Sequence, residues 1–258
     1  MKIQFIGTSG SAITETETYS SILIDDTILL DCGEGTTQKL IKLKVIDKIN
    51  LICITHLHND HFLGIFSLLW YYWIMGRSKK PLLIIGPPNI KSTINTIFDL
   101  INTPKNVFNF EIRYRILKDD NTIQLFEFEN YIIKALKMEH NPISFAYRVY
   151  EKNSEKSITY TGDTKPNDRL ILLAENSDIL ISESTFPDKY SVFAHKYNHC
   201  TPKDAAILAN KSKSKMLIIT HISALFKKEK ERDKFIDEAK RIYKNKIIIA
   251  KDLLNINI

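Results

Sequence analysis

Apolar runs of about four to eight residues recur along the chain and are separated by short polar segments. Runs of this length that are rich in isoleucine, leucine and phenylalanine are typical of strands buried in a sheet. We therefore predict strands at residues 2–6, 20–24, 27–30, 51–54, 82–85, 110–116, 123–128, 131–138, 145–150, 157–160, 179–183, 216–220 and 247–250.

Longer segments, with apolar residues three or four positions apart, predict helices. These are residues 35–43, 61–75, 90–101, 169–174, 201–212 and 228–243. Thr201 is suited to cap the fifth of these helices, and Pro202 follows at its first position. Strands that alternate with packed helices fit two sheets face to face with helices outside.

Four potential metal ligands follow directly after the predicted strand at 51–54. They are His56, His58, Asp60 and His61, and they include three of the seven histidines in the chain. Side chains two positions apart at a strand end point the same way, so these groups should surround one point. Imidazole with carboxylate suits zinc, manganese or iron. The pattern predicts a metal site at a strand-to-helix turn.

Three further residues of the same types each lie just past the end of an apolar run. They are His140, Asp163 and His221. A histidine that only packs in a core would lie inside such a run. A site for two ions ~3.5–4 Å apart needs more ligands than one short motif supplies, including a bridging carboxylate. These three residues are the candidates for that role.

The His-x-His-x-Asp-His pattern of residues 56–61 is the signature of the metallo-β-lactamase superfamily. Other blocks resemble the ribonuclease Z family, the zinc endonucleases that trim precursor tRNA at its 3′ side. The resemblance covers roughly residues 1–226. It rests on Phe5-Ile6-Gly7-Thr8-Ser9-Gly10, Leu29-Leu30-Asp31-Cys32-Gly33-Glu34-Gly35-Thr36-Thr37-Gln38, Ile84-Ile85-Gly86-Pro87-Pro88, Tyr160-Thr161-Gly162-Asp163-Thr164, Leu180-Ile181-Ser182-Glu183-Ser184-Thr185-Phe186, His199-Cys200-Thr201-Pro202 and Thr220-His221-Ile222-Ser223.

The resemblance implies a four-layer αββα sandwich, with two mixed β-sheets flanked by helices and the metals at the strand ends along one rim. It also implies two Zn²⁺ ions, although Mn²⁺ or Fe²⁺ would accept the same ligands. A hydroxide between the metals would attack the phosphorus, and Asp60 would orient that water or accept its proton. The implied ligands are His56, His58, His140 and Asp163 for one ion, and Asp60, His61, Asp163 and His221 for the other, with Asp163 bridging.

The leaving alkoxide needs a proton donor, for which His199 is the best candidate because its imidazole can be protonated near neutrality. Glu183 would orient that imidazole and favour its charged form. His195 is the alternative donor, but we expect it in a mobile loop at residues 187–198 that contacts substrate.

Departures from the family put the substrate in doubt. Family members carry a long tRNA-clamping arm between the ligands that match His140 and Asp163. Here only 22 residues separate the two, and a predicted strand pair uses nearly all of them. Ser182 and Ser184 replace the usual His and Ala, and residues 224–226 also differ. An arm-less relative, the cyclic phosphodiesterase of phosphonate breakdown, shares the metal motif. A small-molecule phosphodiesterase acting on cyclic or phosphorylated metabolites is therefore the alternative to a tRNA enzyme.

Charge and aromatic residues leave two questions open. The net charge is +6, and residues 211–246 hold twelve Lys or Arg against five acids. That region either contacts a phosphate backbone or forms the solvated face of an amphipathic helix. Four consecutive aromatic residues, 70–73, could stack on bases, but four in a row cannot share one face of a helix. We therefore expect them in the core or in a dimer interface, since the family is homodimeric.

Length and composition narrow the class. A chain of 258 residues that is 44% hydrophobic can form a single metallo-β-lactamase-like domain over residues 1–258. No apolar run reaches the ~18–20 residues that span a bilayer, which predicts no membrane partner. Three widely spaced cysteines and the absence of a signal segment favour the cytoplasm.

We thus predict a dinuclear-zinc ribonuclease Z-type endonuclease acting on precursor tRNA. A metal-binding RNA protein without turnover is a third class. Thiolester and β-lactam hydrolases lack the later blocks.

Overall fold

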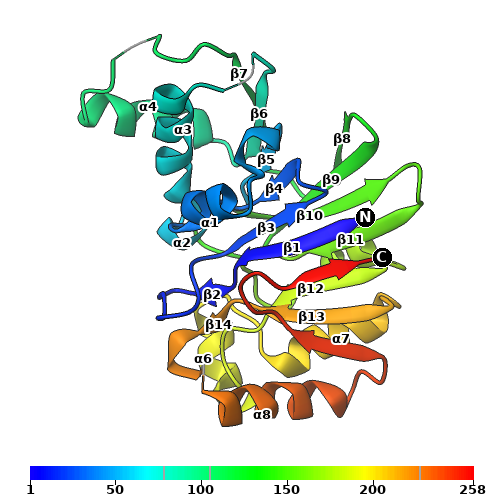
Figure 1. The fold of residues 1–258 in the computed structure, drawn as a ribbon. Coiled ribbons are helices and arrows are strands. Elements are labelled where there is room, and N and C mark those ends of the chain that lie inside the picture. Colours follow the sequence, from blue (N-terminus) through cyan, green and yellow to red (C-terminus); the bar gives the residue numbers. More distant parts are fainter. Residues whose placement is uncertain (78, 105, 227) are drawn as a thin grey trace.

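The computed structural model describes residues 1–77, 79–104, 106–226 and 228–258 (Figure 1). Two seven-stranded mixed sheets form its centre. The first has the order β16-β1-β3-β4-β5-β6-β7, and its strands are β1 (Lys2–Gly7), β3 (Ser21–Ile24), β4 (Ile28–Leu30), β5 (Leu51–Cys53), β6 (Leu82–Gly86), β7 (Ile112–Ile116) and β16 (Asn255–Asn257).

The second sheet also has seven strands. In chain order its antiparallel strands come first and its parallel strands follow. Its order is β15-β13-β12-β11-β10-β9-β8, and its strands are β8 (Gln124–Phe128), β9 (Tyr131–Met138), β10 (Ser144–Glu151), β11 (Lys156–Tyr160), β12 (Ile179–Glu183), β13 (Met216–Thr220) and β15 (Lys246–Ile249). A short parallel pair, β2 (Ser9–Gly10) and β14 (Ile222–Ser223), connects the two halves of the chain.

Helices cover the outer face of each sheet (Figure 1). The first sheet carries α1 (Thr36–Lys42), α3 (Gly64–Met75) and α4 (Ile90–Leu100), and the second carries α5 (Asp168–Ala174), α7 (Pro202–Lys211) and α8 (Glu229–Lys240). Two shorter helices, α2 (Asn59–Phe62) and α6 (Ser191–Lys196), lie beside the strand ends, and 3₁₀ helices span Ile46–Lys48, Asp188–Tyr190 and Ala224–Phe226.

Three apolar layers separate these elements. The inner layer packs sheet against sheet and includes Phe5, Leu30, Phe145 and Ile181, all buried. The two outer layers pack each sheet against its helices. Burial of this apolar surface is the main favourable term that holds the layers together. The predicted αββα sandwich of two mixed sheets is confirmed.

Most predicted elements form, and the strands at 131–138, 179–183 and 216–220 have the predicted bounds. The helix at 201 begins as predicted, because Thr201 and Asp204 form a capping box behind Pro202. The predicted helix at 61–75 is divided at Leu63 into α2 and α3. Sequence reasoning missed β2 and β14, which have only two residues each, and the polar edge strand β16.

The prediction of a mobile loop at 187–198 is wrong. A 3₁₀ helix and α6 occupy this segment. Ala194 is fully buried and its carbonyl accepts a hydrogen bond from the His199 N–H at 2.8 Å. One small buried residue therefore docks a helix whose other side chains are mostly polar or exposed, and a pattern search finds no apolar face there.

The region between His140 and Asp163 contains a plain hairpin. β10 and β11 pair from Tyr147 with Tyr160 to Glu151 with Lys156, which leaves a turn of residues 152–155. Residues 141–162 are all described, and they form no arm. The predicted strand pair is confirmed.

The basic C-terminal region forms an amphipathic helix. Phe235 and Ala239 of α8 are fully buried while most of its charged residues face solvent. Lys227 of that region lies outside the described residues. Across the described part of the chain, no helix has the length and apolar character needed to cross a membrane.

Candidate metal centre

Seven side chains from separate segments meet at one edge of the sandwich. The turn after β5 supplies four of them, and the ends of β9, β11 and β13 supply His140, Asp163 and His221. The carboxyl ends of parallel strands are the usual place for a site in α/β proteins, because strand termini and their loops converge there. All seven are the residues that the sequence predicts as ligands.

The first group consists of His56, His58, His140 and Asp163. His58 Nδ1 lies 3.1 Å from His56 Nε2 and 3.4 Å from His140 Nε2. Asp163 Oδ2 lies 3.8 Å from His56 Nε2. Three imidazole nitrogens and a carboxylate oxygen thus face one point.

The second group consists of Asp60, His61 and His221. Their closest atoms are the Nε2 atoms of His61 and His221, 3.0 Å apart, and His221 Nε2 lies 3.3 Å from Asp60 Oδ2. Asp163 Oδ1 lies 3.3 Å from His61 Nε2, and Asp163 Oδ2 lies 3.4 Å from His221 Nε2. Asp163 therefore borders both groups, as a bridging ligand must.

The spacing of these atoms fits metal ions. Ligand atoms of a tetrahedral zinc site with bonds of ~2.0–2.1 Å lie about 3.3 Å from each other. Asp163 Oδ1 is buried and has no hydrogen-bond partner among the described residues. A buried carboxylate oxygen without a donor is costly unless a cation compensates it. The chemistry of the donor set and this oxygen both indicate metal binding.

Burial keeps three of the histidines ready to coordinate. It lowers the pKa of His56 well below the usual value and also lowers the pKa of His58 and His140. Neighbouring imidazoles add to this effect because two positive rings would repel each other. These rings are therefore neutral near pH 7, and a neutral imidazole is the form that binds a metal.

The second group has the opposite electrostatics. Burial alone would lower the pKa of His61, but the carboxylates of Asp163, Asp31 and Asp60 hold it well above the usual value. Burial would raise the pKa of Asp163, yet His221 and His61 hold it well below the ordinary carboxyl range. The carboxylates around His61 give this group an excess of negative charge, which a bound cation would neutralise.

Asp31 orients His61 and is the main residue that sequence reasoning missed. Its Oδ2 accepts hydrogen bonds from His61 Nδ1 at 2.7 Å and from Tyr160 at 2.9 Å. Both carboxylate oxygens also accept from Thr55, through its backbone N–H and its hydroxyl. The bond at Nδ1 leaves Nε2 of His61 as the nitrogen that faces the other ligands. The signal was present in the Asp-Cys-Gly-Glu-Gly block, to which we assigned no role.

Other rings are held at Nδ1 in the same way. His56 Nδ1 lies 2.9 Å from the Thr55 hydroxyl, and His140 Nδ1 donates to the Asn198 carbonyl at 3.2 Å. His221 Nδ1 lies 3.0 Å from the Thr185 hydroxyl. Because Thr55 donates onward to Asp31, its oxygen accepts from His56 and fixes that tautomer.

One of the proposed ligands has a strained backbone. His221 has φ 57°, in the left-handed region that residues other than glycine rarely adopt. Gly10 packs against it, and a Cβ at Gly10 would lie 2.5 Å from the His221 carbonyl oxygen. Glycine at position 10 is needed because β2 and β14 approach closely and set the position of His221.

His199 and Glu183 form a pair beside the ligands. His199 Nδ1 lies 3.0 Å from Glu183 Oε1, and Glu183 is buried. Burial opposes the charge on His199, but the Glu183 carboxylate raises the pKa of His199 to about 9. The imidazole is therefore protonated at neutral pH, and its Nε2–H is available to a substrate.

His199 also lies near Asp163 and His221 in a grouping that could hold an ion. Its nitrogen nearest to Asp163 is Nδ1, at 4.0 Å, and that atom is already bound to Glu183. Proton donation fits this geometry better than ligation. His195, the alternative donor, is exposed and pairs with Asp204 at 2.8 Å, outside the groups of potential ligands.

A family model described as anti-Pycsar protein Apyc1 matches residues 1–243. The chain belongs to this family. Ribonuclease Z of Methanosarcina acetivorans is 28% identical to this Apyc1-family chain, over 100% of the chain and 98% of the relative. That alignment spans 311 positions although the chain has 258 residues, so about 50 positions of the relative have no counterpart here.

Solved structures agree with this placement. Human tRNase Z, short form, has a TM-score of 0.82 and 29% identity, covering 100% of this chain and 99% of its own. The metallo-β-lactamase fold protein YhfI of Bacillus subtilis has a TM-score of 0.81 and 24% identity, covering 99% and 98%. The predicted resemblance to ribonuclease Z is confirmed. The chain is a metal-dependent hydrolase of the metallo-β-lactamase fold.

Proposed function

We propose that this single-domain protein is a dinuclear-zinc phosphodiesterase of the ribonuclease Z type that removes the 3′ extension of precursor tRNA. The observation that carries the proposal is the pairing of two ligand groups, joined by Asp163, with the His199–Glu183 pair beside them. Full-length relatives named ribonuclease Z support it. Mn²⁺ and Fe²⁺ suit the same ligands.

The seven ligand residues have defined roles in this proposal. His56, His58, His140 and Asp163 hold one ion, and Asp60, His61, Asp163 and His221 hold the other. When bound, the two ions lower the pKa of water and neutralise charge on the phosphoryl oxygens.

Asp60 positions the attacking water. Its Oδ2 is held by the Ser11 N–H at 2.9 Å and lies 3.3 Å from His221 Nε2. Among the described residues the other oxygen, Oδ1, has no hydrogen-bond donor, and it accepts the proton of the water.

His199 donates the proton to the leaving alkoxide. With a pKa of about 9 it carries that proton at neutral pH, and Glu183 stabilises its charged form. Thr185 donates to Glu183 at 2.7 Å and so fixes the carboxylate that holds the ring. General acid catalysis of this kind contributes about 10²–10⁴-fold.

A second candidate is a small-molecule phosphodiesterase with the same metal centre. Two observations favour it: the turn between β10 and β11 is only residues 152–155, and about 50 positions of the ribonuclease Z alignment are missing from the chain. An enzyme for cyclic or phosphorylated metabolites needs no clamp for the body of a tRNA.

Single-turnover cleavage tests the two candidates. The metal-loaded protein is given a 3′-extended precursor tRNA, a cyclic nucleotide and bis-p-nitrophenyl phosphate, each over a range of salt. The first candidate predicts a cut next to the mature 3′ end with an affinity that falls steeply as salt rises. Hydrolysis of the cyclic nucleotide without tRNA cleavage would establish the second candidate. Binding of tRNA without hydrolysis of any substrate would contradict both.

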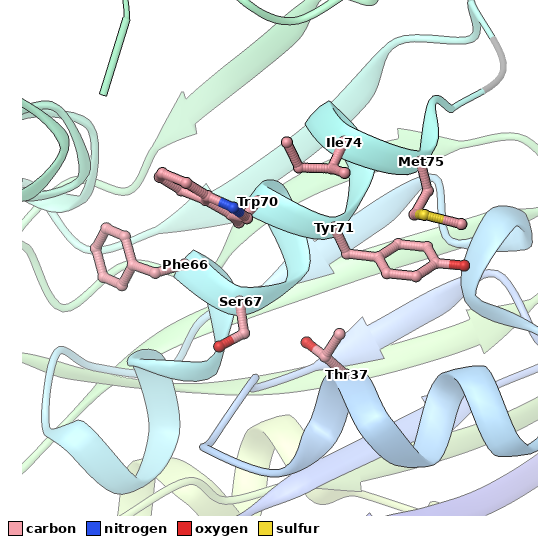
Figure 2. A pocket seen from close by; sticks show the side chains of 7 residues that line it. All are labelled: Thr37, Phe66, Ser67, Trp70, Tyr71, Ile74 and Met75. Atoms are coloured by element: carbon pink, nitrogen blue, oxygen red, sulfur yellow. The ribbon is translucent and has the colours of Figure 1, made fainter. Parts of the chain in front are cut away.

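We also propose a homodimer formed through the outer face of α3. An open groove of about 610 Å³ there is lined by Thr37, Phe66, Ser67, Trp70, Tyr71, Ile74 and Met75. Figure 2 shows the α3 side chains above Thr37 of α1. Trp70 is 40% exposed and Met75 67% exposed, whereas Tyr72 between them is fully buried. The aromatic segment thus divides between core and surface, and exposed apolar patches of this kind mark interfaces.

Light scattering tests the dimer. Trp70→Glu should halve the mass of the particle because it places a charge in a desolvated interface. Leu172→Glu, on α5 and also exposed, is the matched control. A monomeric wild-type protein would overturn this part of the proposal.

The cytoplasm is the proposed compartment. Cys32, Cys53 and Cys200 are all free and buried, which fits a reducing environment.

A further inference from the structure

A group of aromatic rings extends from the proton donor along α6. The Phe186 ring lies 6.0 Å from the His199 ring, and the Phe193 ring lies 5.2 Å from Phe186. The Tyr197 ring lies 4.6 Å from Phe193. We call Phe186, Phe193 and Tyr197 the α6 ring cluster. Phe193 is close to the proposed reaction centre, because the His199 and Phe193 rings are at most about 11 Å apart.

The outer rings are not needed to attach α6 to the protein. Phe193 is 47% exposed and Tyr197 is 52% exposed, whereas Ala194 between them is fully buried. The helix docks through Ala194, and its end is held by the His199 N–H. About half of each of these two side chains therefore remains open to solvent beside the site.

The cluster is fixed relative to the metal ligands. The Asn198 carbonyl accepts a hydrogen bond from the ligand His140 at 3.2 Å, and Ala194 accepts from His199 at 2.8 Å. The segment that carries the rings thus also orients one proposed ligand and the proposed acid. A group stacked on the rings would have a defined position relative to the bond that is cleaved.

Charge around the rings fits a phosphate-bearing partner. Lys196 Nζ lies 5.7 Å from the Tyr197 ring centre. Outside the cluster, Lys189 Nζ lies 4.8 Å from the ring centre of Tyr190, which is connected to Phe186 through the Phe226 ring. Both lysines are exposed. Flat apolar faces flanked by cations are the combination that binds single-stranded nucleotides, since bases stack on rings and phosphates pair with lysines.

We propose that Phe193, supported by Phe186 and Tyr197, is a platform on which the nucleobase next to the cleaved phosphodiester stacks. The proposal rests on the phosphodiesterase activity proposed above, and it holds for either substrate class. Stacking on an aromatic face tolerates any base, so this platform selects nucleotides over other phosphodiesters without reading a sequence.

Two esters with the same leaving group test the platform. Thymidine 5′-(p-nitrophenyl phosphate) carries a base, and methyl p-nitrophenyl phosphate carries none. In Phe193→Ala the ratio of kcat/KM for the first ester to that for the second should fall about tenfold. Phe193→Leu, which keeps apolar volume without an aromatic face, should lower the ratio similarly, and Phe193→Trp should restore it. Val192→Ala is the matched control, since Val192 is 85% exposed on the same helix and belongs to none of the ring contacts.

A binding measurement separates this inference from the proposed activity. The fluorescence of 2-aminopurine riboside 5′-monophosphate should be quenched by the wild-type protein and not by Phe193→Leu. Quenching through Phe193 in a protein that hydrolyses neither ester would support the platform and refute the phosphodiesterase. An unchanged ester ratio together with unchanged quenching in Phe193→Leu would overturn the platform while leaving the activity intact.

Discussion

The metal edge and the α6 ring cluster lie side by side but are built in opposite ways. At the metal edge five of the seven proposed ligands are buried, and the residue behind them is tightly held, as Asp31 shows with its bonds to His61, Thr55 and Tyr160. In the ring cluster, Phe193 and Tyr197 are about half exposed and contact only each other and Phe186 among the aromatic rings of the described residues.

This difference separates the chemistry from the choice of substrate. A buried polar network is intolerant of change, because removal of one member leaves another unsatisfied. Exposed rings, or the length of the turn at 152–155, can change without loss of a ligand. The metal centre can therefore stay constant among relatives while the substrate varies.

The largest effect is expected at the bridging carboxylate. Asp163→Asn should lower kcat/KM for any phosphodiester on the order of 10⁴-fold, because it removes a ligand from both groups and several kcal/mol of charge stabilisation. Metal content should fall in parallel, measured by atomic absorption after dialysis. Asp99→Asn, exposed on α4, is the control. Full metal content with full activity would show that Asp163 is not a ligand at this edge.

His199→Ala should have the next largest effect, and that effect should depend on the leaving group. We expect about 10²–10³-fold loss for an alkoxide leaving group, which needs a proton, and little loss for p-nitrophenolate, which does not. Single-turnover rates on paired substrates measure this. His195→Ala is the matched control because His195 is exposed and pairs with Asp204 away from the ligands. An equal loss on both substrates would contradict the role of proton donor.

Asp31→Asn tests whether buried residues behind the ligands tune the metal edge. Replacing the carboxylate should weaken metal binding about 10–100-fold, because His61 loses the charged acceptor at Nδ1 and one of the two accepting oxygens becomes an NH2 donor. Competition with a chromophoric chelator measures the affinity directly. Unchanged affinity in a folded variant would mean that the Asp31 bonds serve stability alone.

Glu183→Gln should have the smallest effect on activity of these four substitutions. The loss of activity should be slight at low pH and larger at high pH. The pKa of His199, raised to about 9, should fall toward its ordinary value of 6.5 when the carboxylate is removed. A general acid acts only when protonated, so activity on an alkoxide substrate should fall about 30-fold at pH 8 and less than about twofold at pH 6. A pH–rate profile measures this, with Glu155→Gln on the hairpin turn as control. A loss that is independent of pH would contradict the electrostatic role.

Local patterns were enough to predict most strands and to single out residues that the structure brings together as possible ligands. Strands such as residues 131–138 bury an apolar run and end at a polar residue, and each predicted ligand follows such an end. The sequence pattern predicted neither α6 nor the ring cluster that it carries, because a helix that packs through a single alanine has no apolar stripe. Asp31 belongs to the block at residues 29–38 that resembles ribonuclease Z. Its contacts are not local, since Thr55, His61 and Tyr160 are 24, 30 and 129 positions away.

The sequence by itself thus determined the αββα fold, the identity of the candidate ligands and the shortness of the segment between His140 and Asp163. These depend on residue types and spacing along the chain. The resemblance to ribonuclease Z already implied that Asp163 bridges two ions and that Glu183 favours the charged form of His199. Only the tertiary structure showed the distances that place Asp163 against both ligand groups, the contact between Glu183 and His199, and the rings that extend from His199 along α6. Those properties are distances between side chains on separate elements, and they come into existence when the two sheets pack and their strand ends converge.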